Sequence, residues 1–109
     1  MAVSTIEAKA SIATLVNVFT VLPEQQRAMV DLLAKTTEEI MRHRPGFIST
    51  NIHASADGTK VLNCAQWESE ADLRAVLAGP VAMEQLGQAQ KLSVSFDPGI
   101  YHVESVHHC

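Results

Sequence analysis

The chain has 109 residues, 47% of them hydrophobic, and a formal net charge of −4. This length fits one small domain, and the hydrophobic content is enough for a core, which excludes global disorder. The 8 Lys and Arg residues are scattered, which argues against nucleic-acid binding. No apolar run approaches the roughly 20 residues of a membrane span. The N-terminus also lacks signal-peptide features, so we expect a cytoplasmic protein with no membrane partner.

The first part of the chain predicts an arm, a strand and a helix. Residues 1–11 have few large apolar groups and predict an N-terminal arm. Residues 12–21 are rich in β-branched and aromatic residues, which is typical of a strand. Residues 24–43 predict an amphipathic helix that begins after Pro23 and ends before Pro45-Gly46. Residues at helical spacing support it: Met29, Leu32, Leu33, Thr36, Ile40 and Met41.

The middle of the chain predicts a hairpin followed by a second helix. Strands over residues 47–55 and 60–67 flank a turn that contains Asp57-Gly58, a strong hairpin signal. Ser69 can cap a helix that runs to about residue 78, and Asp72 completes a near capping box.

The last part predicts another helical stretch and a final strand. Gly79-Pro80 interrupts the second helix, and residues 81–89 continue in helical pattern. Residues 92–106 predict the last strand, with a bend or bulge at 97–99. Residues 107–109 predict a C-terminal tail.

The order β-α-β-β-α-β is typical of an α+β, ferredoxin-like domain over residues 12–106, with an antiparallel sheet and helices on one face. In this topology the first and third strands are central neighbours, so Asn17 and Asn63 lie on adjacent strands. Both strands are apolar on both sides, which indicates that both sheet faces are buried. We therefore expect a homodimer whose sheets pack face to face.

A candidate site follows from two polar residues in these apolar strands. Asn17 and Asn63 each interrupt an apolar run, and Trp67 lies on the same strand face as Asn63. An amide can hydrogen-bond an oxyanion, and tryptophan offers a flat face and one N–H donor. These residues suit a flat aromatic ligand with an enolate or phenolate oxygen. Alternatively, the asparagines satisfy backbone groups at bulges and Trp67 belongs to the core.

The histidines and cysteines give weaker signals. His53 and His102 are candidate bases or ligands, or half-buried strand residues. The tail His107-His108-Cys109 is a candidate cluster at a chain end, where mobility is common, and we expect no metal site there. Cys64 and Cys109 have no CxxC spacing, so we expect free thiols.

Over about residues 12–106 the chain resembles the antibiotic biosynthesis monooxygenase family, small ferredoxin-like dimers that form an α/β-barrel. Within it, the chain is most similar to the cofactor-independent anthrone oxygenases of aromatic polyketide pathways. The matching segments are residues 15–19 with Asn17, residues 44–47, residues 63–69 and residues 96–101.

This resemblance implies oxidation of an anthrone-type aromatic polyketide to a quinone by molecular oxygen, with no metal or flavin cofactor. Asn17 and Asn63 would hydrogen-bond the substrate oxygen and the nascent peroxide, and Trp67 would stack on the ring or donate to the intermediate. His53 is the candidate base or substrate contact. The other partners expected are the substrate, O2 and a second copy of the chain.

Three rival interpretations stay open. Haem degradation by a related subgroup needs an iron-binding histidine about ten residues after Trp67, where this chain has Leu77. Processing of a small aldehyde or ketone would prefer a more polar pocket. A non-catalytic ligand-binding dimer is the third, because a fold does not fix a function.

Overall fold

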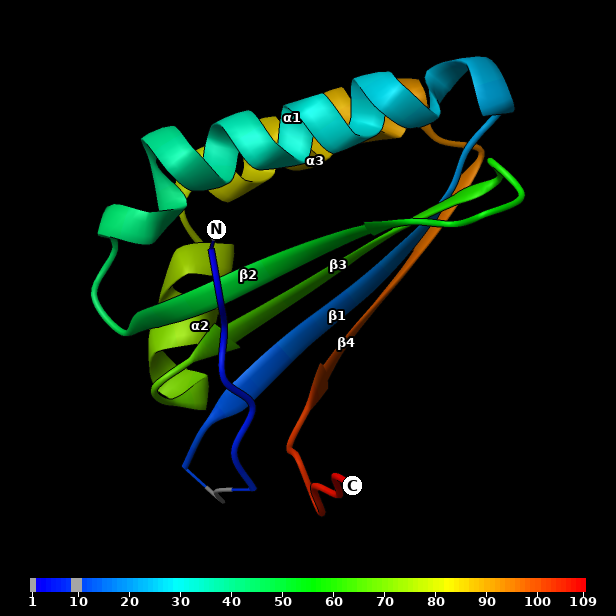
Figure 1. Cartoon of the computed structure of the whole chain (residues 1–109). Coiled ribbons are helices and arrows are strands. Elements are labelled where there is room, and N and C mark those ends of the chain that lie inside the picture. The colour runs from blue at the N-terminus through cyan, green and yellow to red at the C-terminus, as the bar shows by residue number, and fades with distance from the viewer. Residues whose placement is uncertain (1, 9–10) are drawn as a thin grey trace.

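The computed structural model describes residues 2–8 and 11–109, and the chain forms a four-stranded antiparallel sheet with helices on one face (Figure 1). The strand order is β2-β3-β1-β4, so β1 and β3 are the central neighbours, and the predicted ferredoxin-like topology is confirmed. The elements in chain order are β1 (Ala13–Thr20), the 3-10 turn η1 (Pro23–Gln25), α1 (Gln26–Glu39), the 3-10 turn η2 (Met41–His43), β2 (Phe47–Ala54), β3 (Lys60–Trp67), α2 (Glu70–Leu77), α3 (Pro80–Leu92) and β4 (Ser95–Tyr101).

The predicted helix over residues 24–43 is wrong at both ends. It is a 3-10 turn, then α1, then a second 3-10 turn that starts after Ile40, whose φ of −128° is not helical. The chain then turns into β2 through Gly46, whose φ is +84°. An alanine there would be strained, and its Cβ would clash with the Asp72 carboxylate. The chain must reverse its direction between α1 and β2, and the helix therefore ends before residue 43.

The last strand is also shorter than predicted. The third helix extends to Leu92, and β4 ends at Tyr101, so residues 92–94 and 102–106 are not strand. No bulge forms at 97–99, because β4 pairs with β1 in unbroken register and Pro98 lies opposite Asn17. As the outer strand of the sheet, β4 can hold a proline without losing a ladder hydrogen bond on its free side. The bulge lies instead in β2, between Phe47 and Ser49.

The core lies between the sheet and its helices and has two clusters. One is centred on α1, the end of β1 and the start of β3. The other is centred on α2, the start of β1 and the end of β3. Their buried members are Phe19, Val21, Met29, Leu33, Val61 and Ala89 in the first, and Ala13, Ala65, Trp67 and Leu73 in the second. None of the helices in residues 2–8 and 11–109 is long and apolar enough to cross a membrane.

Residues 2–8 of the arm lie against the second face of the sheet, the face without helices (Figure 1). The Ser4 hydroxyl donates to Asn51 Oδ1 over 2.9 Å, and Gln66 Nε2 donates to the Thr5 carbonyl over 2.9 Å. Positions 1, 9 and 10 of the predicted arm lie outside the described residues. Other apolar residues of this face are half-buried: Val16, Val18, Leu62 and Cys64. A sheet buried on both faces, and the dimer it implies, stay predictions.

Candidate functional site

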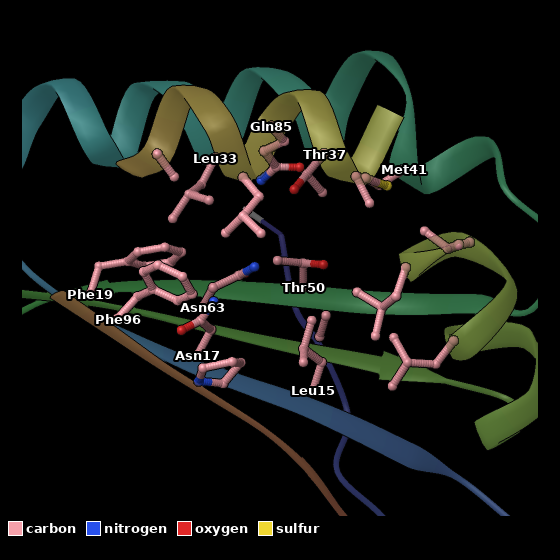
Figure 2. Close-up of a pocket in the computed structure, with 18 of the residues that line it drawn as sticks. Leu15, Asn17, Phe19, Leu33, Thr37, Met41, Thr50, Asn63, Gln85 and Phe96 are labelled. Carbon is pink, nitrogen blue, oxygen red and sulfur yellow. The ribbon is translucent and has the colours of Figure 1, made fainter. Parts of the chain in front are cut away.

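A cavity of about 320 Å³ lies between the sheet and the helices (Figure 2). This volume is at the low end of the roughly 300–1,000 Å³ typical of small-molecule sites. Its walls are mostly apolar, from β1, β3 and β4 on one side and α1, α2 and α3 on the other. The apolar lining residues include Leu15, Phe19, Leu33, Met41, Ala65, Leu73, Val76, Leu77, Ala82, Met83, Leu86, Ala89, Phe96 and Pro98.

The two asparagines predicted from the sequence meet on the sheet side of this cavity. Asn17 of β1 lies directly opposite Asn63 of β3, and both side chains line the cavity (Figure 2). Directly opposed residues of an antiparallel pair have neighbouring side chains. Both Oδ1 atoms are buried and lack a hydrogen-bond partner among the described residues. Since no bulge lies at either position, the alternative that these amides satisfy a bulged backbone loses its basis.

Trp67 joins the asparagines in the wall of the cavity. It is only 3% exposed, and its ring packs edge-on against Phe47, with centroids 5.4 Å apart and an interplanar angle of 88°. Its Nε1 is buried and has no acceptor in the described part of the chain. Trp67 is therefore a core residue that also brings an unused donor to the site.

Three polar residues of the cavity were missed by the sequence reasoning. Thr37 of α1 and Gln85 of α3 face the cavity from the helix side, and Thr50 of β2 lies across from them (Figure 2). The signal was available in the helical spacing. Thr37 lies midway between Leu33 and Met41, and Gln85 shares a helix face with apolar residues: Ala82, Leu86 and Ala89.

The structure does not bring His53 to the cavity. His53 is exposed and pairs with Leu62, on the face opposite Asn63, whose partner on β2 is Ile52. Alternate residues of a strand point to opposite faces, so a base at position 53 cannot face a ligand in this cavity. His102 lies outside it too, with Nδ1 2.9 Å from the Ile12 carbonyl.

The described residues that line the cavity include none whose side chain titrates near neutral pH. The groups with shifted pKa values lie elsewhere. Burial raises the pKa of the Cys64 thiol, on the second face of the sheet, which disfavours the thiolate. A hydrogen bond from Arg74 lowers the pKa of Glu70 on the exposed side of α2. The site can therefore hydrogen-bond and desolvate a ligand, but offers it no ionisable group.

Comparisons with known proteins agree on one family. The sequence profile of the antibiotic biosynthesis monooxygenase family matches residues 12–83. Tetracenomycin-F1 monooxygenase from Streptomyces glaucescens is 52% identical to this chain over 77 residues, which are 71% of this chain and 69% of that protein.

Two solved structures extend the likeness to the fold. A monooxygenase from the gene ActVA-Orf6 of Streptomyces coelicolor, in complex with nanaomycin D, is 31% identical, with a TM-score of 0.80 over 91% of this chain and 92% of that chain. SnoaB from Streptomyces nogalater, a cofactor-independent oxygenase, is 25% identical, with a TM-score of 0.74 over 89% of this chain and 97% of that chain.

Proposed function

Because this chain belongs to the antibiotic biosynthesis monooxygenase family, we propose that it is a cofactor-independent monooxygenase that oxidises an anthrone-type aromatic polyketide to a quinone with O2. The observation that carries this proposal is the set of unused polar atoms in an apolar cavity: Oδ1 of Asn17, Oδ1 of Asn63 and Nε1 of Trp67. Buried polar atoms normally have hydrogen-bond partners, so these three unpaired atoms favour a ligand that forms hydrogen bonds with them. The tetracenomycin-F1 and SnoaB relatives support the class of reaction.

The cavity suits a planar, weakly polar substrate. Its walls are aliphatic and aromatic, and its polar groups are uncharged amides, hydroxyls and one indole N–H. An ionised carboxylate or phosphate would lose its hydration there without gaining a charged partner. A fused aromatic ketone loses little hydration, and its single enolate oxygen can accept from an amide N–H and from Trp67.

The reaction needs no redox cofactor if the substrate itself supplies the electrons. Loss of one proton from the ring CH2 gives an enolate, which passes one electron to O2, and the resulting radical pair forms the C–O bond of a peroxide. Loss of the second C–H proton then breaks the O–O bond and releases water, so CH2 and O2 become C=O and H2O.

In this scheme the Nδ2–H groups of Asn17 and Asn63 donate to the enolate oxygen and the peroxide from positions fixed by the sheet, and their unpaired Oδ1 atoms can accept from the protonated peroxide. The apolar walls exclude water from the radical pair. With His53 on the other face, the first proton leaves to solvent or to water at the cavity mouth, helped by the acidity of the substrate.

The haem-degrading alternative receives no support from the cavity. Leu77, which stands where that interpretation needs an iron-binding histidine, lines the cavity, and the described lining residues include no histidine.

The proposal is tested by oxygen uptake and quinone absorbance with dithranol and metal-stripped protein. We expect uptake well above the spontaneous rate, one O2 per quinone, and no effect of a chelator. With labelled dioxygen, one labelled atom should appear in the quinone. Oxygen uptake no faster than with heat-denatured protein would contradict the proposed enzyme activity and favour a ligand-binding protein. Activity lost to a chelator and restored by metal would contradict the cofactor-free mechanism.

The proposed active form is a homodimer joined through the second face of the sheet. This face leaves Val16, Val18 and Leu62 only half-buried, beside the part that the arm covers. Burial of such a face is a common reason for a sheet to pair with a second copy. Light scattering at micromolar concentration should give twice the chain mass of 11.8 kDa, and a monomer mass would refute the dimer.

A further inference from the structure

The helix side of the cavity carries a second polar group, across from the two asparagines. Gln85 of α3 and Thr37 of α1 both point into the cavity from the helix side, whereas Asn17 and Asn63 reach it from the sheet (Figure 2). Both residues are partly buried. We call the pair Gln85 and Thr37 the roof pair.

A glutamine at position 85 needs an explanation, because the fold favours an apolar residue there. Its neighbours on the cavity face of α3 are all apolar: Ala82, Leu86 and Ala89. Leucine has about the same helix propensity as glutamine and would contribute more to packing than an amide. An amide in an apolar cavity costs free energy unless water or a ligand hydrogen-bonds it. The placement of Gln85 is therefore better suited to binding than to stability.

The chemistry of the roof pair limits what it can bind. A glutamine amide both donates and accepts, and a threonine hydroxyl does the same, so together they match a neutral hydroxyl. The described lining residues include no Lys, Arg or His, so the roof pair offers no charge to a carboxylate or phosphate. A phenolic hydroxyl on an aromatic ring fits these requirements.

We propose that the roof pair is a specificity site that binds a phenolic hydroxyl on an outer ring of the substrate, remote from the carbon that is oxidised. This inference rests on the proposed function, and it narrows the substrate class to polyphenolic anthrones with oxygen on more than one edge. The asparagines hold the oxygen conjugated to the reacting carbon, and the roof pair fixes the orientation of the ring system. Gln85 is thus a positioning residue rather than a catalytic one.

The test uses the only tryptophan of the sequence as a reporter of binding. Trp67 lines the cavity, so an aromatic ligand that enters should quench its fluorescence. Emodin and chrysophanol are suitable probes, because both carry two hydroxyls that already bond to the adjacent quinone carbonyl, and emodin has one further outer-ring hydroxyl that is free to bond the roof pair. We expect Gln85→Leu to weaken emodin binding by about three- to tenfold, the value of one lost neutral hydrogen bond. Chrysophanol binding should stay unchanged, and Thr37→Val should show the same selectivity with a smaller effect.

A matched control is available on the same helix. Gln88 is exposed and does not line the cavity, so Gln88→Leu should leave the binding of both probes unchanged. Gln85→Met, an apolar replacement with an unbranched side chain, should reproduce the selectivity of Gln85→Leu. Thermal unfolding should show both Gln85 variants at least as stable as the wild type.

Equal weakening of both probes by Gln85→Leu, or unchanged emodin binding, would overturn the proposal. Turnover of the two corresponding anthrones separates this result from the proposed function. In one outcome, the wild type oxidises neither anthrone, but Gln85→Leu still weakens the binding of emodin and not that of chrysophanol. The monooxygenase proposal then fails and the hydroxyl site stands. If the wild type oxidises both and the variant shows no change in preference, the hydroxyl site fails alone.

Discussion

The two faces of the central strands bury amide side chains that differ in the use of the amide N–H group, although the amide oxygens of Gln66, Asn17 and Asn63 all lack a partner among the described residues. On the second face, Gln66 is 2% exposed, and its Nε2 donates to the Ser49 hydroxyl and the Thr5 carbonyl. On the cavity face, Asn17 is 9% exposed and Asn63 lies beside it, and neither Oδ1 has a partner among the described residues. The Gln66 amide ties the arm to the sheet, whereas Asn17 and Asn63 line the cavity and make no side-chain hydrogen bond with the described residues.

This difference separates a structural role from a binding role. A buried amide that donates to its own chain contributes to stability, and its loss leaves acceptors unpaired. A buried amide that makes no hydrogen bond with its own chain contributes less to the fold and keeps its hydrogen-bonding capacity for a ligand. Four variants below test this separation, and a fifth, in the turn between β2 and β3, is expected to have the smallest effect.

Asn63→Ala should separate activity from stability most clearly. Removal of one preorganised hydrogen-bonding group should lower kcat by about 100- to 1,000-fold. The free energy of unfolding should change by less than about 1 kcal/mol, because the lost oxygen had no partner. Oxygen uptake and thermal unfolding measure the two effects.

Asn51→Ala is the matched control on the second face. Asn51 accepts a hydrogen bond from Ser4, so its loss should cost stability by about 0.5–1.5 kcal/mol and leave kcat unchanged. The comparison breaks down if the two alanine variants have the same activity.

Trp67→Phe should remove the indole N–H while keeping an aromatic ring in the wall. We expect kcat to fall by about 10- to 100-fold, because one donor to the intermediate is lost. Stability should fall by only about 1 kcal/mol, from the smaller ring volume, because the Nε1–H had no acceptor. Full activity in this variant would show that the indole N–H of Trp67 serves no step of the reaction and that the residue only packs in the core.

Gln66→Leu should give the reverse pattern. The Thr5 carbonyl and the Ser49 hydroxyl lose their donor, so the free energy of unfolding should fall by about 1–3 kcal/mol. The cavity is on the other face, so kcat per folded protein should stay within about twofold of the wild type. A large loss of kcat with unchanged unfolding would show that the two faces are not independent.

Asp57, in the turn between β2 and β3, should show the smallest effect. Hydrogen bonds from Thr59, then from Ser55, lower the pKa of this exposed carboxyl from its ordinary value to about 2. Because the folded pKa is depressed, this stabilisation is present above the unfolded pKa of about 3.9 and is lost as the pH falls towards 2.

The measurement is thermal unfolding of wild type and Asp57→Ala across this range of pH. The stability difference between the two proteins should shrink as the pH falls from 4 towards 2. A difference that is constant with pH would show that the carboxylate charge does not stabilise the turn.

Much of the fold followed from local patterns. The bounds of β3 matched the prediction, and Ser69 caps α2 by accepting from the Asp72 N–H, as the capping box indicates. The errors came where tertiary pairing decides the local structure. From sequence alone Pro98 predicts a bend or bulge, but in the edge strand β4 it lies in regular register with β1.

The candidate site also has a part that local patterns predict and a part that depends on tertiary packing. Strand alternation placed Asn63 and Trp67 on one face, and the topology placed Asn17 beside Asn63, so this part was predictable. The sequence could not tell that His53 faces away from the cavity, because its position relative to the bulge in β2 sets the face on which it lies. The shift between Phe47 and Ser49 fixes which residues of β2 face the helices. Thr37 and Gln85 come from two different helices, and only the packing of α1 and α3 brings them together.

The sequence by itself determined the element types, the ferredoxin-like order and the two amides on neighbouring strands, because hydrophobic period and turn chemistry act over a few residues. Only the tertiary structure decided which sheet face receives the helices, where the cavity lies and which buried amides hydrogen-bond to the chain itself. Those properties depend on contacts between segments far apart in the chain, such as Gln66 with Thr5, and no local pattern encodes them.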